Sequence, residues 1–233
     1  MKNKKITIGI LAGMGPKSTS PFLDLVIEQC QKQYEAHDDI DFPHIIIYSL
    51  PTPFYIGKKI NNKEMELTIR NGLQKLESMG VDFIAMPCNI AHKYFDYLKR
   101  SINIPLLNII EATANDIDST TNRVAVLATK ATMETNIYQK AIKEKNKEFI
   151  YKKAWQQKID SLIQNIKKGE SQNNLSLRVK EIIRLLSNEK VDTIIVACTD
   201  LTKVMKKIKG FHIIDSSEAL AKETLKTYLN YSK

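Results

Sequence analysis

Two nine-residue segments of this 233-residue chain share one pattern, and this repeat constrains the fold more than any other feature. Residues 81–89 read VDFIAMPCN, and residues 191–199 read VDTIIVACT. Each begins with Val-Asp, continues as a short apolar run and reaches a cysteine at the same offset. A pattern that returns after so long an interval indicates two related supersecondary units. We therefore predict two similar lobes, one carrying Cys88 and the other carrying Cys198.

Apolar runs alternate with amphipathic stretches along the chain, which is typical of β-α-β units and a parallel sheet. The expected strands are residues 6–12, 44–50, 82–86, 104–107, 123–128, 192–197 and 212–214. The expected helices are residues 19–36, 64–79, 91–99, 132–145, 158–168, 175–186 and 217–229. The predicted fold class is α/β, with a mostly parallel sheet flanked by helices in each lobe and a pseudo-two-fold relation between the lobes. We expect the first lobe to comprise residues 1–105 plus 214–233, and the second to comprise residues 106–213.

Composition limits the class of protein. With 43% hydrophobic and 26% charged residues the chain is ordinary for a globular protein, and no stretch is apolar enough to span a bilayer. The net charge of +9 comes mostly from scattered lysines, so nucleic-acid binding is not expected. Three cysteines and no secretory signal favour a reduced, cytoplasmic protein without a disulfide framework. The spacing of Cys and His gives no metal site.

The two matched cysteines are the candidates for catalysis. Pro87 cannot continue a central strand, so Cys88 is expected at the carboxyl end of its strand, where open parallel sheets bind ligands. A helix is expected after each cysteine, and a helix N-terminus stabilises a thiolate and lowers the thiol pKa towards neutrality. Such a thiol can act as general acid or base. A single cysteine such as Cys30 is better explained as a core residue, whereas two facing thiols can move a proton between the two faces of one carbon.

A Cys-His nucleophile is the rival chemistry, because His92 lies one helical turn beyond Cys88 while Cys198 has no comparable histidine. The glycine-rich segment 9–19 (GILAGMGPKST) lacks the order of a dinucleotide fingerprint. It is interpreted as a tight loop whose N–H groups can face an anion such as a carboxylate, or as a structural turn. In the second half, Thr129 and Thr132 can cap a helix or hold a carboxylate, with capping favoured for Thr132.

Four segments together resemble the aspartate/glutamate racemase family, and the resemblance covers nearly the whole chain. They are residues 13–16 (GMGP), 86–92 (MPCNIAH), 127–129 (LAT) and 197–201 (ACTDL). The resemblance implies an active site between two α/β lobes, a homodimer, a small amino-acid substrate, and no pyridoxal phosphate or other cofactor. It also implies that Cys88 and Cys198 are the base and the acid, exchanging roles with the direction of reaction.

The resemblance further assigns substrate contacts near these motifs. Asn89, Thr199 and the backbone around Ile90 and Ala91 would hold the carboxylate and the amino group. Lys167 falls where members that act on acidic substrates carry a lysine, and a solvated lysine beside Lys168 is an equally good interpretation. With the loop residues, the expected substrate-binding set is Met14, Pro51, Thr52, Asn89, Ile90, Ala91, Thr129, Thr132, Lys167 and Thr199.

Two departures from the family pattern bear on the substrate. Ile90 replaces the threonine of a common Cys-Asn-Thr, which removes a hydroxyl. Residues 51–59 read PTPFYIGKK where members that act on acidic substrates usually carry Pro-Asp-Arg, and a lysine is not an equivalent bidentate clamp. Either Lys58, Lys59 or Lys167 receives a side-chain carboxylate, or the substrate is not a simple acidic amino acid and the aromatic residues of this segment line a more apolar pocket.

These observations predict an amino-acid racemase, an isomerase that interconverts L and D enantiomers by proton transfer through a thiolate/thiol pair. On the same fold, the alternatives are a decarboxylase, a cis-trans isomerase or a hydantoin-type racemase. An alternative from another class is a ligand-binding relative without turnover.

Overall fold

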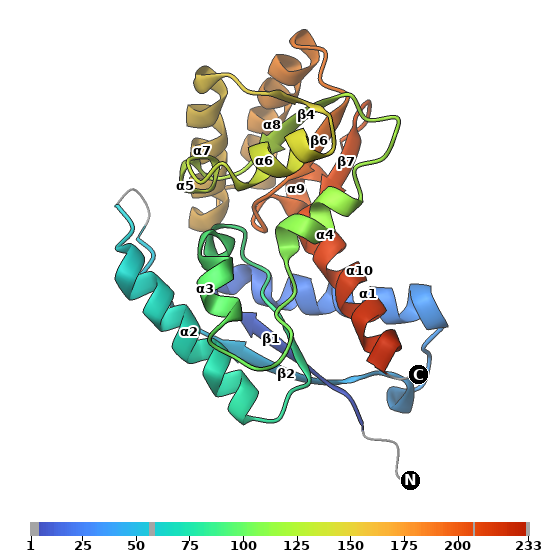
Figure 1. Cartoon of the computed structure of the whole chain (residues 1–233). Helices are drawn as coiled ribbons and strands as arrows, with labels where there is room; N and C mark the ends of the chain where they lie inside the picture. The colour runs from blue at the N-terminus through green and yellow to red at the C-terminus, as the bar shows by residue number, and fades with distance from the viewer. Residues whose placement is uncertain (1–4, 56–58, 207, 232–233) are drawn as a thin grey trace. The chain divides into compact units, whose positions relative to one another are not determined.

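The structure is a computed structural model that describes residues 5–55, 59–206 and 208–231 (Figure 1). It divides into two compact units, the first formed by Met1–Ile109 with Leu220–Lys233 and the second by Ile110–Ala219. Each unit has a parallel sheet and a hydrophobic core of its own. The expected α/β class, with parallel sheets flanked by helices, is confirmed.

The first unit is built around a three-stranded parallel sheet in the order β2-β1-β3. Its strands are β1 (Thr7–Ala12), β2 (His44–Ser49) and β3 (Phe83–Ala85). Its helical elements are η1 (Pro16–Ser18), α1 (Thr19–Tyr34), η2 (Asp39–Asp41), α2 (Asn62–Ser78), η3 (Ile90–Tyr94) and α3 (Phe95–Lys99). β1 lies between the other two strands, and α2 packs against all three strands. Five of the six residues of β1 are therefore buried.

The second unit has a four-stranded parallel sheet in the order β5-β4-β6-β7. Its strands are β4 (Arg123–Leu127), β5 (Glu148–Ile150), β6 (Thr193–Val196) and β7 (His212–Asp215). Its helices are α5 (Lys130–Met133), α6 (Ile137–Glu144), α7 (Lys153–Lys168), α8 (Gln172–Asn188) and α9 (Thr202–Met205), while α4 (Ile109–Asn115) and α10 (Ser216–Tyr231) carry the chain from one unit to the other.

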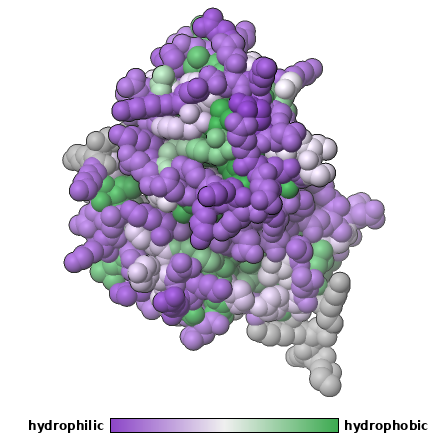
Figure 2. Space-filling model, turned by 45° about the horizontal axis from the view of Figure 1, so that its top comes forward, coloured by the Kyte–Doolittle hydropathy of each residue, from purple (hydrophilic) through white to green (hydrophobic). Residues whose placement is uncertain are grey.

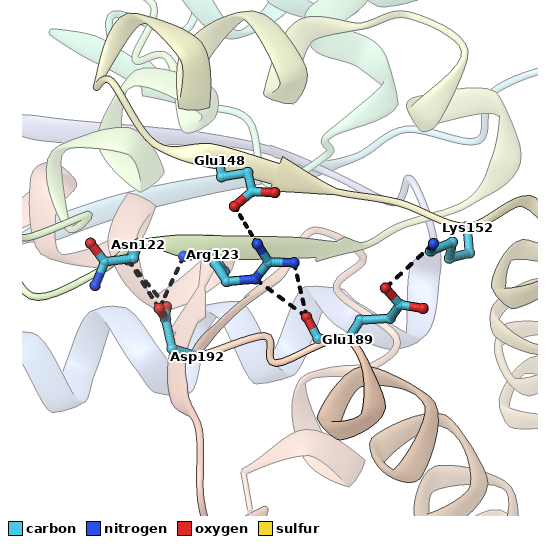
Figure 3. Close-up of polar contacts among 6 residues, drawn as sticks. All are labelled: Asn122, Arg123, Glu148, Lys152, Glu189 and Asp192. Atoms are coloured by element: carbon cyan, nitrogen blue, oxygen red, sulfur yellow. Dashed lines mark hydrogen bonds and ion pairs between the residues drawn. The ribbon is translucent and has the colours of Figure 1, made fainter.

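The repeated Val-Asp has a structural explanation that is the same in both units. The Asp82 carboxylate accepts the N–H of Thr7 at 2.8 Å, where β1 begins. The Asp192 carboxylate accepts the N–H groups of Arg123 at 3.0 Å and Asn122 at 3.1 Å, where β4 begins (Figure 3). Each aspartate therefore holds the strand that leads to a cysteine against the first strand of its unit.

Arg123 extends this connection across the second sheet (Figure 3). Its guanidinium contacts the carboxylate of Glu148 in β5 and donates to the backbone oxygen of Glu189 at 3.1 and 3.3 Å. The Glu189 carboxylate pairs with Lys152 at 3.4 Å. These ion pairs are partly exposed and add little stability, so the hydrogen bonds that Asp192 and Arg123 make with backbone groups matter more.

The structure differs from the expected elements where segments are short. The expected strand 104–107 forms only an isolated bridge between Leu106 and Ile84. The expected helix 132–145 is divided into α5 and α6, because Asn136 between them adopts a left-handed conformation with φ 59°. Four elements, α4, β5 and the 3-10 helices η1 and η2, were not expected, and each has at most seven residues. The helix expected after Cys198 is present as the four-residue α9.

The surface agrees with the scattered lysines of the sequence. Hydrophilic residues cover most of the face shown in Figure 2, with smaller hydrophobic areas between them. Among the described residues, no helix combines the length and the apolar character needed to cross a membrane.

Candidate active-site residues

The two cysteines occupy equivalent positions in the two sheets. β3 pairs with β1 and β6 pairs with β4, and Cys88 and Cys198 follow β3 and β6. Because all these strands are parallel, each cysteine lies at the sheet edge from which the loop after the first strand also leaves. This carboxyl edge is where open parallel sheets bind ligands.

Cys88 is held in a tight turn at the edge of the first sheet. Its N–H donates to the carbonyl of Met86 at 2.8 Å, and the residue is 7% exposed. It belongs to a core cluster that includes Ala91, and Met14 and Ile90 pack against the same cluster. Asn89, the next residue along the chain, is also buried. The structure thus brings together several of the expected substrate-binding residues in this unit.

The helices that follow the cysteines are shorter than expected. η3, which begins two residues after Cys88, is a five-residue 3-10 helix, and α9, which follows Cys198, has four residues. A macrodipole sums over aligned peptide units, so such short elements contribute little of it. The expected stabilisation of both thiolates by helix N-termini is therefore small, and other groups must set their protonation.

His92 does not form the Cys-His pair that its spacing suggested. Its Nδ1 lies 2.9 Å from the carbonyl oxygen of Cys88, and its Nε2 accepts the N–H of Ile109 at 3.1 Å. Since Nε2 must accept, Nδ1 carries the proton and donates to Cys88. Both ring nitrogens are therefore committed to backbone groups. His92 fixes the turn that carries Cys88 and has no nitrogen left to activate its thiol.

We expect His92 to make stability depend on pH. Burial lowers its pKa to about 4 in the folded chain, against about 6.5 when unfolded. The unfolded state binds the proton first, so this contribution to stability is present above pH 6.5 and is lost as pH falls towards 4. Between pH 7.5 and 5 the free energy of unfolding should decrease by about 2 kcal/mol through this residue.

Urea unfolding at both pH values, in the wild type and in His92→Asn, measures this contribution. Asparagine can still donate to the Cys88 carbonyl but does not titrate. The variant should lose about 2 kcal/mol of the pH dependence, and an unchanged pH dependence would show that His92 is not the group responsible.

The glycine-rich loop is organised largely by its own hydrogen bonds. The N–H of Gly13 donates to Thr19 Oγ1 at 3.2 Å, and the hydroxyl of Ser18 donates to the carbonyl of Gly15 at 2.7 Å. Gly13 has φ +89°, and a Cβ there would lie 2.5 Å from the backbone nitrogen of Leu50. The Gly13 N–H is therefore not available to an anion, and Gly13 serves the close approach of the two loops that follow β1 and β2.

The segment after β2 carries two of the expected contacts. Pro51 is exposed and Thr52 is half-buried. The backbone carbonyl of Thr52 accepts the N–H of Phe54 at 2.7 Å. Phe54 packs against the core cluster that contains Cys88, whereas Tyr55 is 61% exposed. Lys59 is exposed. The other lysine considered for a substrate carboxylate, at position 58, lies outside the described residues.

The helix cap of the second unit lies on a different threonine from the one expected. Thr129, not Thr132, is the N-cap of α5, and its Oγ1 accepts the N–H of Thr132 at 3.3 Å. Thr132 is 3% exposed, and its hydroxyl lies 3.1 Å from that of Thr129. The cap must precede the first helical residue, and the helix begins earlier than the sequence pattern suggested. The loop is further held by Gln156, which donates to the carbonyl of Ala128 at 2.9 Å.

Cys198 is linked to a charged pair that the sequence did not reveal. Its Sγ donates to Oδ2 of Asp200 at 3.8 Å, and the same oxygen pairs with Lys167 Nζ at 2.9 Å. The Asp200 side chain is only 8% exposed and that of Lys167 is 24% exposed. Lys167, at the end of α7, is therefore not a solvated lysine. Thr199, between Cys198 and Asp200, is half-buried.

A metal site is not evident in the part of the chain that the structure describes, where no three His, Cys, Asp or Glu side chains gather to hold an ion. Cys30, Cys88 and Cys198 are not joined in disulfides. The chemistry of these residues is that of thiols, a carboxylate, an ammonium and hydroxyls.

The sequence and the fold of this chain are similar to those of known racemases. The family model described as Asp/Glu/Hydantoin racemase matches residues 11–224. The chain is 47% identical to the "Broad specificity amino-acid racemase RacX" of Bacillus subtilis (strain 168) over 225 residues, which cover 96% of this chain and 99% of the relative. It is 30% identical to a glutamate racemase of Persephonella marina over 194 residues, 78% of this chain and 73% of the relative. Among solved structures, the Picrophilus torridus aspartate racemase matches with a TM-score of 0.80 and 29% identity, over 96% of this chain and 94% of that chain.

Proposed function

This chain belongs to the Asp/Glu/Hydantoin racemase family, and on that premise we propose that it is a cofactor-independent amino-acid racemase. The relative that is 47% identical along almost its whole length is an amino-acid racemase, which is an isomerase. The observation that carries the proposal is the equivalent position of Cys88 and Cys198, each beyond the carboxyl end of the strand next to the first strand of its sheet.

In the proposed mechanism the two thiols act on opposite faces of the substrate's α-carbon. One cysteine, as thiolate, takes the α-proton, and its sulfur becomes a thiol. The electron pair left on carbon is delocalised into the substrate carboxylate, which needs hydrogen-bond donors around it. The other cysteine, as thiol, gives its proton to the opposite face and becomes a thiolate. Atoms and charges balance, and no other reactant is consumed.

We propose that the substrate's side chain is uncharged. The segment after β2 has no arginine to clamp a side-chain carboxylate, and Phe54 from that segment packs on the core cluster of Cys88. The charge of Lys167 is balanced by Asp200. A second carboxylate brought to this pair would meet the negative charge of Asp200 as well as the positive charge of Lys167. The broad specificity named for the Bacillus relative supports a pocket that does not demand an acidic side chain.

Chiral chromatography tests both the activity and the substrate class. Pure enantiomers of acidic, neutral and basic amino acids are incubated with the chain under reducing conditions, with no pyridoxal phosphate added. We expect neutral amino acids to be converted to their mirror images in both directions, faster than aspartate or glutamate. Preferential racemisation of an acidic or a basic substrate would contradict the substrate class alone, and no conversion of any amino acid would contradict the racemase itself.

We further propose that the chain works as a homodimer in the cytoplasm. The strand β2 is the edge of the described sheet and exposes apolar surface, with Ile47 37% exposed, which a second copy could cover. A mechanism that needs free thiols also needs a reducing compartment. Sedimentation equilibrium should give twice the mass of 26.6 kDa, and a monomer at working concentration would reject the dimer.

A further inference from the structure

We propose that Asp200 is a positioning residue that keeps Cys198 in its thiol form, so that Cys198 is the proton donor and Cys88 the base in the resting enzyme. The assignment of donor and base rests on the racemase function proposed above. The protonation of Cys198 is independent of that function, because it depends only on the groups around this sulfur.

The geometry places Asp200 where it must act on the sulfur. The N–H of Leu201 donates to the carbonyl of Cys198 at 2.9 Å, which closes residues 198–201 into a turn. Within this turn the Asp200 carboxylate accepts from Sγ at 3.8 Å. The carboxylate is almost fully buried and is held from its other side by Lys167 at 2.9 Å, so it has little freedom to turn away.

The charges explain why the thiol is favoured. A thiol has a proton to donate to the carboxylate, whereas a thiolate at the same place would face a negative charge across a few ångströms. Lys167 acts in the opposite sense, because an ammonium near the sulfur favours a thiolate. Since the carboxylate stands in contact with both groups, it compensates the charge of Lys167 and leaves the balance on the side of the thiol.

The other charged groups on the surrounding elements have different contacts. On α7, Asp160 accepts the N–H of Lys130 at 2.9 Å and a bond from Gln156. On β7, Asp215 accepts the N–H of Ser217 at 2.8 Å, and Lys203 of α9 is exposed. Cys198 itself lies in a core cluster of apolar residues that includes Leu201 and Met205. We expect Asp200, which contacts Sγ, and its partner Lys167 to influence the protonation of Cys198 most strongly.

This assignment gives the catalytic cycle a preferred starting state. Cys88 begins as the thiolate and takes the α-proton, and Cys198 gives up its proton and ends as a thiolate beside Asp200. This final state, with the thiolate on Cys198, is less stable than the starting state, with the thiolate on Cys88. The starting state is restored when Cys198 takes up a proton and Cys88 loses one. Proton exchange with water is sufficient for this return.

Alkylation of Cys198 by iodoacetamide as a function of pH tests the proposal without any need for activity. The modified peptide that contains Cys198 is quantified by mass spectrometry in the wild type, Asp200→Asn and Lys167→Met. The midpoint of the curve of alkylation rate against pH reports the ionisation of Cys198. We expect Asp200→Asn to lower this midpoint by about one pH unit, which gives about tenfold faster alkylation near neutral pH. Lys167→Met should move the midpoint up.

Glu170→Gln is the matched control, because this carboxylate follows α7 but pairs with Arg178 at 3.1 Å. It should leave the midpoint unchanged. If reagent access to the buried sulfur limits the rate, the ultraviolet absorbance of the thiolate in a Cys30→Ala, Cys88→Ala background gives the same midpoint. An unchanged or raised midpoint in folded Asp200→Asn overturns the proposal. A lowered midpoint in a chain that racemises nothing would retain it and reject only the proposed function.

Discussion

Cys88→Ala and Cys198→Ala should each lower racemase turnover by at least about 10³-fold, because each removes a group that must accept or donate the transferred proton. Cys→Ser should be nearly as severe, since a hydroxyl is a much weaker acid than a thiol and forms no useful base near neutral pH. Chiral chromatography with the best substrate of the panel measures the loss.

The residual chemistry of the two variants should differ in an informative way. With Cys198 removed, the Cys88 thiolate can still take a proton from the enantiomer that faces it and return it to the same side. That enantiomer should exchange its α-proton with solvent without inversion, and the opposite enantiomer should do so in Cys88→Ala.

Cys30→Ala is the matched control for Cys88→Ala and Cys198→Ala. Cys30 is a fully buried cysteine of α1, and burial raises the pKa of its thiol. Its replacement should preserve turnover and reduce only stability. Near wild-type racemisation by either Cys88→Ala or Cys198→Ala would contradict a mechanism with two thiols.

Gly13→Ala should cause a large loss of stability, at least about 3 kcal/mol, because two effects add at this position. The backbone has φ +89°, which disfavours any residue with a Cβ, and that Cβ would lie 2.5 and 2.6 Å from backbone atoms of Leu50. Neither backbone can move easily, since the N–H of Leu50 donates to the carbonyl of Ala12 at 3.0 Å.

Gly169→Ala separates the two effects. Gly169 ends α7 with φ +80°, and a Cβ there would meet nothing within 4 Å. This variant should lose only the conformational part, about 1–2 kcal/mol. Urea unfolding of both variants gives the comparison, and equal losses would show that the contact with Leu50 is not what makes Gly13 necessary.

Two kinds of feature could be predicted from the sequence: elements whose pattern is visible within one segment, and features that occur in both copies of the repeat. Long apolar runs and amphipathic stretches gave most strands and helices, because their periodicities are visible within one segment. The repeat around Cys88 and Cys198 placed both thiols at sheet edges, and the duplicated aspartates Asp82 and Asp192 proved to have one structural role in both units. Elements of three or four residues, such as β5 and α9, are too short to show a period.

The parts that could not be predicted depend on contacts between distant segments. Lys167 and Asp200 are common surface residue types, and their pairing depends on where α7 ends relative to the turn after β6. The only signal for Asp200 was its place two residues after Cys198. His92 illustrates the opposite error, because its spacing from Cys88 suggested catalysis, whereas both ring nitrogens contact backbone groups. Spacing alone does not show which atoms of a side chain are already engaged.

The central claim is that two thiols act on opposite faces of the α-carbon. Deuterium incorporation into substrate and product at low conversion tests it most directly. A pure enantiomer is incubated with the chain in deuterated buffer, and α-proton signals of both enantiomers are followed at low conversion by NMR after chiral separation. With two thiols, the product should carry deuterium from the donor thiol while the remaining substrate keeps its proton. Equal deuterium in substrate and product from the earliest time would show that one group serves both faces and would contradict the mechanism.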